Sequence, residues 1–261
     1  MNRQDEVRSP NTSASSPKER LDKVIKRRGL IRSRSRAQRM IAAGRIRVDG
    51  RILTRPGHPI DPEADIEVLS FEQYVSQGGD KLAAALDHFK IDPTGLIALD
   101  VGASTGGFTD CLLQHGAAKV HAIDVGHDQL NSRIRRHPKV VAREGLNARY
   151  LEPEDIDEFV DLVVIDVSFI SLKLILPPLV DILGPQGQII ALVKPQFEVG
   201  KANLPDDGVV KDDALRQAVL TDIQAFIEAE TPWHVQATMQ SPVEGSKGNI
   251  EFLIHIKSPA A

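Results

Sequence analysis

The stretch Ile97 to Phe108, IALDVGASTGGF, decides how this chain of 261 residues folds. Four residues typical of a strand, Ile97 to Asp100, end in an acid. A run of small residues follows, and a helix-like segment then extends from Phe108 to Gln114. A strand that feeds a helix through a small-residue turn brings backbone N–H groups and a helix N-terminus up to a ligand. We therefore predict an α/β domain with a cofactor site at this turn.

The glycine spacing distinguishes this turn from a dinucleotide-binding fingerprint. The motif G-x-G-x-x-G would need a glycine two residues after Gly102, where the chain has Ser104. An acid directly before the turn, here Asp100, is typical of S-adenosylmethionine (SAM) sites, in which a carboxylate can lie near the positive end of the cofactor. The turn therefore favours SAM as the cofactor.

Beyond Pro93, apolar runs alternate with helix-like segments, and the runs are interpreted as seven strands. These strands are predicted at residues 96–101, 119–124, 140–143, 162–167, 188–193, 235–239 and 250–256. Alternation of strands and helices implies a mostly parallel sheet. Because little chain separates the last two runs, we expect them to form a hairpin at one edge, as in SAM-dependent methyltransferases.

The N-terminal part differs from the rest of the chain in charge. Residues 1–60 hold 16 Lys and Arg against 5 Asp and Glu, whereas the other 201 residues hold 16 against 31. This asymmetry indicates that the N-terminal part meets a polyanion, and a well-solvated basic surface is the alternative interpretation. Residues 1–18 contain almost nothing apolar, so we expect a disordered tail.

Residues 19–68 have the pattern of a small α+β module. Two amphipathic helices are expected, one from Leu21 and one at 34–43, with Ser33 and Gly44 suited to cap the second. Alternating apolar residues around Asp49-Gly50 predict a tight hairpin, and one more short strand ends the module. We expect a linker at 69–79 because of its two glycines, a helix at 81–88, and a second domain at 80–261.

Composition argues against several other classes of protein. The single cysteine, Cys111, allows no disulfide within the chain and fits a reducing cytosol, so a cytoplasmic location is expected. The first residues lack a secretory pattern, and no apolar run reaches roughly 18 residues, so no membrane span is expected. The histidines show no ligand spacing, so no metal site is expected. The oligomeric state cannot be read from the sequence.

Ligands of parallel sheets bind beyond the carboxyl ends of the strands, where this chain carries several polar residues. Asp124 closes the second strand and is placed either to bind ribose hydroxyls or to cap a turn. Asn147 follows the third strand and could meet an adenine edge. The predicted cofactor contacts are Asp100, Gly102, Ser104, Thr105, Gly106, Gly107, Phe108, Asp124, Val125, Asn147 and Asp166.

The N-terminal module resembles the S4 RNA-binding domain over residues 20–53, RLDKVIKRRGLIRSRSRAQRMIAAGRIRVDGRIL. Arginines bracket the start of its second helix, where backbone N–H groups also favour phosphate. Almost no aromatic residues are interleaved, so we expect recognition of RNA shape and backbone. The candidate RNA contacts are Arg20, Arg32, Arg34, Arg36, Arg39 and Arg45.

Four residues, Lys81, Asp166, Lys194 and Glu251, match the Lys-Asp-Lys-Glu tetrad of FtsJ-like ribose 2′-O-methyltransferases. With the S4-like module and the motifs DVGASTGGFTD, AIDVG, VVIDVSFISL, LVKPQFE and KGNIEFL, the chain resembles the TlyA family over residues 19–257. Members of that family are rRNA methyltransferases that also carry the label hemolysin. The resemblance implies a Rossmann-like, SAM-dependent methyltransferase domain with a mostly parallel seven-stranded sheet, preceded by an S4 domain. It also implies methyl transfer to a ribose 2′-OH of ribosomal RNA, with cytidine expected, in free RNA or in ribosomal subunits.

The tetrad residues receive roles through this resemblance. A ribose hydroxyl is a poor nucleophile, so it must be aligned and must lose its proton as it attacks. Lys194 would be nearest to that task, either as a neutral base or as a cation that stabilises the developing alkoxide. Asp166 would orient Lys194, and Glu251 would pair with Lys81.

Two other functions are weighed against this one. A membrane-active hemolysin would need a spanning or strongly amphipathic basic segment, which the sequence does not show. A non-catalytic, RNA-binding ribosome assembly factor is disfavoured because all four tetrad residues are present.

The chain departs from the family at one loop, where Gln77 replaces the usual arginine and Asp80 lies beside Lys81. This departure removes a charge that would otherwise be available to RNA.

Overall fold

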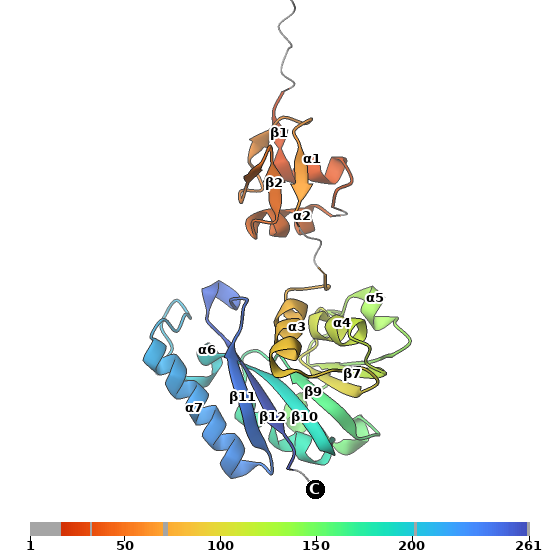
Figure 1. The fold of residues 1–261 in the computed structure, drawn as a ribbon, viewed down its shortest axis with the longest axis vertical. Coiled ribbons are helices and arrows are strands. Elements are labelled where there is room, and N and C mark those ends of the chain that lie inside the picture. Colours follow the sequence, from red (N-terminus) through yellow and green to blue (C-terminus); the bar gives the residue numbers. More distant parts are fainter. Residues whose placement is uncertain (1–16, 32, 70–72, 201–202, 260–261) are drawn as a thin grey trace, which may run out of the picture. The chain divides into compact units, whose positions relative to one another are not determined.

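A computed structural model describes residues 17–31, 33–69, 73–200 and 203–259. The chain divides into two compact units, residues 1–71 and 72–261 (Figure 1). Most of the expected tail at 1–18, part of the expected linker at 69–79, and Arg32 lie outside the described residues.

The helices of the first unit pack around one small apolar core. They are α1 (Leu21–Arg27) and α2 (Arg34–Ala42). Their apolar faces bury Leu21 and Ile25 of α1 against Met40 and Ile41 of α2. The predicted N-cap is confirmed, because the Ser33 hydroxyl accepts a hydrogen bond from the backbone N–H of Arg36 at 3.2 Å.

The strands of the first unit form two small sheets. Their bounds are β1 Glu19–Arg20, β2 Ile46–Val48, β3 Arg51–Ile52, β4 Pro59–Ile60 and β5 Ile66–Val68. The predicted hairpin is confirmed: Asp49 and Gly50 join β2 to β3 with φ of 47° and 78°, as a type I′ turn requires. Strand β5 pairs with β2, and β4 pairs with β1. The chain from 59 to 68 thus forms two strands where the sequence predicted one.

The second unit is built on one seven-stranded sheet with the order β11-β12-β10-β9-β6-β7-β8. Its strands are β6 Ile97–Val101, β7 Lys119–Asp124, β8 Val140–Glu144, β9 Val160–Ile165, β10 Leu183–Val193, β11 His234–Gln240 and β12 Phe252–Lys257. Strand β12 pairs antiparallel with both β10 and β11, and the other pairings are parallel. The prediction of a mostly parallel, seven-stranded sheet with an edge hairpin is confirmed.

Helices cover both faces of this sheet because side chains alternate along its strands (Figure 1). In β9, Leu162 and Val164 join the core beneath α3 (Gly78–Phe89) and α4 (Gly107–Gln114). The intervening Val163 and Ile165 join the larger core that contains residues of α7 (Asp213–Glu230). The remaining helices are α5 Ser132–Arg135 and α6 Pro195–Glu198, and short 3₁₀ turns lie at Ala148–Tyr150, Pro153–Asp155, Leu172–Leu174, Pro177–Asp181 and Ser246–Gly248.

The helix expected at 81–88 begins earlier, at Gly78, because the residues before it pack into the second unit. Tyr74 is buried in the core shared with α3 and α4, and the Val75 N–H donates to Asp110 Oδ2 at 2.9 Å. A Cβ atom at Gly79 would lie 2.2 Å from the Tyr74 ring. Glycine is therefore required at position 79 for this close approach of the chain.

Candidate active site

The turn after β6 packs directly against the loop that follows β9. Gly102 has a φ of +84°, and a Cβ atom there would lie 2.6 Å from the carbonyl oxygen of Asp166. Ser104 also has positive φ, at 47°, and its N–H donates to Asp124 Oδ2 at 2.7 Å. This hydrogen bond holds a backbone conformation that a serine seldom adopts. The turn is thus fixed to the ends of two neighbouring strands.

Two adjoining hollows run along this turn and share Gly102, Ser104, Asp166 and Ser168 in their walls. The smaller, of about 200 Å³, is also lined by Thr105, Gly107, Phe108 and Lys194. The larger, of about 420 Å³, is also lined by Asp124, Val125 and Asn147, with apolar side chains such as Ile123 and Leu146. All the predicted cofactor contacts except Asp100 and Gly106 therefore lie in one continuous cleft.

Asp100 lies behind the turn, outside the walls of both hollows. Its carboxyl group is fully buried, and Oδ2 accepts a hydrogen bond from the Thr109 hydroxyl at 2.6 Å. Burial raises the pKa of this carboxyl group to about 7. Its Oδ1 atom has no hydrogen-bond partner among the described residues. Gly106 is also outside the cleft walls, and a Cβ atom there would lie 2.9 Å from Leu130.

The two polar residues predicted to hold a nucleoside also stabilise turns. The Asp124 carboxylate accepts the N–H groups of Ser104 and Gly126, both at 2.7 Å. The Asn147 Oδ1 atom accepts the Arg149 N–H at 3.1 Å. Asp124 therefore does cap a turn, as considered from the sequence. Each oxygen of its carboxylate retains a lone pair that a ligand could use.

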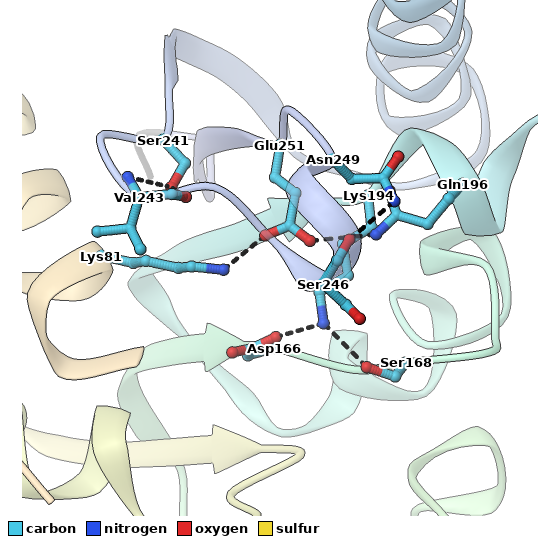
Figure 2. Close-up of polar contacts among 10 residues, drawn as sticks. All are labelled: Lys81, Asp166, Ser168, Lys194, Gln196, Ser241, Val243, Ser246, Asn249 and Glu251. Carbon is cyan, nitrogen blue, oxygen red and sulfur yellow. Dashed lines mark hydrogen bonds and ion pairs between the residues drawn. The ribbon is translucent and has the colours of Figure 1, made fainter. Parts of the chain in front are cut away.

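The four tetrad residues form two ion pairs, drawn together in Figure 2. Lys194 Nζ lies 2.6 Å from Asp166 Oδ1, and Lys81 Nζ lies 2.6 Å from Glu251 Oε2. Both lysine side chains are about nine-tenths buried, with exposed fractions of 10% and 9%. Val193, the last residue of β10, pairs with Phe252, the first residue of β12. Lys194 follows Val193 and Glu251 precedes Phe252, so the antiparallel pairing brings both residues to the same edge of the sheet.

Sequence reasoning missed two polar partners of the tetrad. Ser168 accepts a hydrogen bond from Lys194 Nζ at 3.0 Å. The buried Gln196 donates from Nε2 to Glu251 Oε1 at 3.1 Å. Both residues lie inside the quoted motifs VVIDVSFISL and LVKPQFE. Their closeness in sequence to Asp166 and Lys194 was therefore the signal that could have identified them. Serine and glutamine are not titratable, however, and a search for acids and bases passes over them.

The expected RNA-contacting arginines are distributed over the N-terminal unit. Arg20 and Arg34 both contact the Asp22 carboxylate, at 3.0 Å in each case. Arg39 on α2 and Arg45 before β2 are exposed, and Arg36 is partly buried.

The described parts of the chain contain no group of three or more His, Cys, Asp or Glu residues that could hold a metal ion. Among the described helices, none is both long and apolar enough to cross a membrane.

The strand order, with β12 inserted antiparallel beside β10, and the glycine turn after β6 define a Rossmann-like methyltransferase. Residues 74–258 match the FtsJ-like methyltransferase family, and residues 19–66 match the S4 domain. The 16S/23S rRNA (cytidine-2′-O)-methyltransferase TlyA of Mycobacterium tuberculosis is 43% identical over 92% of this chain and 90% of its own length. With this similarity, the chain belongs to the TlyA family of FtsJ-like methyltransferases, and the expected resemblance is confirmed.

Two further relatives extend the comparison. The 23S rRNA (cytidine-2′-O)-methyltransferase TlyA of Campylobacter jejuni is 38% identical over 73% of each chain. A solved structure of a hemolysin-labelled protein from Streptococcus thermophilus is 40% identical, with a TM-score of 0.74, and the match covers 94% of this chain and 90% of that one. Proteins with both functional labels therefore share this architecture.

Proposed function

We propose that this protein transfers a methyl group from SAM to the ribose 2′-hydroxyl of a cytidine in ribosomal RNA. The observation that carries the proposal is the pairing of Lys194 with Asp166 at the wall of the cleft, with the Lys81–Glu251 pair at the same edge of the sheet. The relatives named for cytidine 2′-O-methylation support the substrate class.

The cleft suits the two ends of SAM. The larger hollow combines the apolar Ile123, Val125 and Leu146 with the polar Asp124 and Asn147, a combination that fits an adenosine group. The smaller hollow follows the turn at 102–108 and fits the amino-acid end. When bound, SAM supplies an electrophilic methyl group on a sulfonium.

Lys194 is proposed to act as a cation. Its amino group faces the Asp166 carboxylate and donates to the Ser168 hydroxyl, two acceptors that stabilise an ammonium. In that form it can hold the acceptor oxygen and stabilise the negative charge that develops as the hydroxyl proton passes to solvent water. Asp166 fixes the position of the ammonium through their ion pair, and it lies in the wall shared by both hollows.

The Lys81–Glu251 pair is proposed to place a second cation near the acceptor ribose. Glu251 and Lys81 are both buried, with exposed side-chain fractions of 2% and 9%. Burying an ion pair has a desolvation cost, so such a pair contributes little to stability on its own. Its location beside Lys194 therefore favours a role in binding the acceptor.

The S4 domain is proposed to deliver the RNA. Residues 1–60 carry an excess of 11 positive charges, and exposed arginines such as Arg39 and Arg45 suit phosphate contacts. One relative is named for two rRNAs and the other for 23S rRNA, so both ribosomal subunits are candidate substrates.

The proposal is tested with tritiated SAM, isolated ribosomal subunits and naked rRNA from a strain that lacks the modification. We expect label in alkali-resistant dinucleotides that contain cytidine, because a 2′-O-methyl group blocks alkaline cleavage. Label confined to base positions would contradict the proposed acceptor. SAM binding without transfer to any RNA would favour the non-catalytic assembly role, and leakage of dye from liposomes at low protein concentration would favour the hemolysin role.

A further inference from the structure

The N-terminal unit contains an acid in an unexpected place. Asp22, in the first turn of α1, has a side chain with an exposed fraction of 0% within the most basic part of the chain. An isolated buried carboxylate has a large desolvation cost and persists only where it is paired and hydrogen-bonded. Its partners therefore indicate why it is present.

Three side chains donate hydrogen bonds to this carboxylate. Arg20 donates from Nε to Oδ1 at 3.0 Å and from Nη2 to Oδ2 at 3.1 Å. Arg34 donates from Nε to Oδ2 at 3.0 Å, and Gln38 donates from Nε2 to the same oxygen at 2.7 Å. The hydrogen bond from Arg20 is the main cause that holds the pKa of Asp22 well below its usual range, so the carboxyl group is ionised.

The geometry makes Asp22 a common anchor for two arginines. Arg20 precedes α1 and Arg34 begins α2, so the carboxylate joins residues that are 14 positions apart in the sequence. Their guanidinium groups cover Asp22 but remain partly accessible, with exposed side-chain fractions of 47% and 44%. Arg34 contacts Asp22 through Nε, and its two terminal amino groups have no hydrogen-bond partner among the residues that the structure describes.

We propose that Asp22 is a positioning residue for RNA binding, which holds Arg20 and Arg34 as a fixed pair of phosphate donors. The proposal rests on the proposed function, because it assumes that this unit binds RNA. Ordering a long side chain at the moment of binding costs affinity, and a carboxylate that has already ordered two arginines removes that cost. The fixed guanidinium planes also suit the bidentate geometry of a phosphate.

For the RNA affinity of a variant that lacks Asp22, the proposal predicts a change opposite in sign to the change expected from net charge alone. Asp22→Asn removes a negative charge from a basic surface, so simple electrostatics predicts tighter RNA binding. We expect binding to weaken by about tenfold, because both arginines lose their charged anchor. Glu63→Gln makes the same change in charge at an exposed acid of the same unit, and it should leave affinity unchanged or improve it slightly.

The experiment uses the full chain and measures its dissociation constant for naked rRNA at several salt concentrations. For Asp22→Asn we expect weaker binding and a salt dependence whose slope falls by about one phosphate contact. The slope separates lost phosphate contacts from a general loss of stability, which thermal unfolding measures in parallel. Equal or tighter binding by folded Asp22→Asn would overturn the proposal. Failure of the wild-type chain to bind RNA would instead overturn the proposed function.

A second pair of variants keeps the test decisive if Asp22→Asn unfolds the domain. Arg34→Lys preserves the charge, but a compact ammonium lacks the planar fork with which a guanidinium can meet Asp22 through Nε and a phosphate through its terminal amino groups. Arg51→Lys makes the same exchange at an exposed position of the same unit, on β3, that is not among the candidate RNA contacts. We expect several-fold weaker binding for Arg34→Lys and less than a twofold change for Arg51→Lys, and equal effects would contradict the proposal.

Discussion

At the scale of single residues, the tetrad depends on neutral partners that keep its charges in place. Glu251 is held on one oxygen by Lys81 and on the other by Gln196. A Cβ atom at Gly245 would lie 2.0 Å from Glu251 Oε1, so the glycine lets the main chain close over the carboxylate. The position of Lys81 is thus set by residues that line neither hollow.

Replacement of Gln196 should reveal this support. Gln196→Leu removes the hydrogen bond to Glu251 at similar volume, so the Lys81–Glu251 pair becomes mobile. We expect kcat to fall by about tenfold while the dissociation constant of SAM changes little, since misplaced support groups reduce rate more than binding. Steady-state kinetics and calorimetry measure the two quantities. The same exchange at Gln217, which is exposed on α7, serves as the control.

Asp100 should make stability depend on pH. Its pKa is raised from 3.8 to about 7 in the folded chain, so the folded state holds a proton that the unfolded state has released. The stabilisation from this proton is complete below the unfolded pKa and is lost as pH rises toward 7, a loss of at most about 4 kcal/mol. Asp100→Asn removes the effect.

The measurement is the melting temperature of both proteins between pH 5 and pH 8. We expect the melting temperature of Asp100→Asn, relative to wild type, to increase across this range. A difference that stays constant with pH would show that Asp100 does not titrate there.

At the scale of secondary-structure elements, the site depends on the contact between the loops after β9 and β10. Glu198, at the end of α6, accepts hydrogen bonds from the Ser171 hydroxyl at 2.5 Å and the Leu172 N–H at 2.9 Å. The rings of Phe169 and Phe197 also meet, with centroids 4.8 Å apart. These contacts fix the loop that carries Asp166 to the segment that carries Lys194.

Loss of the hydrogen bonds that Glu198 accepts from Ser171 and Leu172 should weaken both cofactor binding and turnover. Glu198→Ala frees the loop from 166 to 171, which lines both hollows, so we expect SAM to bind several-fold more weakly and kcat to fall by about tenfold. Glu198→Gln retains an acceptor for the Leu172 N–H and should lie between wild type and Glu198→Ala. If both variants bind SAM like wild type, Glu198 has no role in shaping the cleft.

Hydrophobic periodicity was sufficient to predict the seven strands of the large sheet, because each strand carries its own alternating or apolar pattern. The boundaries near the site shifted where distant contacts decide them. Tyr74 packs beside Gly79 and draws the start of α3 back to Gly78, and no local signal records that contact. The candidate site was predictable where charged residues follow strands. The burial of Asp100 and the support from Gln196 depend on tertiary packing, which sequence spacing does not encode.

At the scale of the whole molecule, charge is divided between the two units. Residues 1–60 carry an excess of 11 positive charges, and the rest of the chain carries an excess of 15 negative charges. The acidic methyltransferase domain buries Lys81 and Lys194 in the two ion pairs of the tetrad. On the proposed function, the basic S4 domain supplies the affinity for RNA and the methyltransferase domain supplies the chemistry.

The most direct test of the central claim is single-turnover methyl transfer by Lys194→Ala, with saturating SAM and rRNA. Lys173→Ala is the matched control, because Lys173 pairs with the exposed Asp222 and lines neither hollow. The account predicts that Lys194→Ala loses at least about 100-fold in rate. It also predicts that SAM affinity changes by less than about threefold and that Lys173→Ala keeps the wild-type rate. A Lys194→Ala protein that transfers methyl groups at close to the wild-type rate would contradict the account.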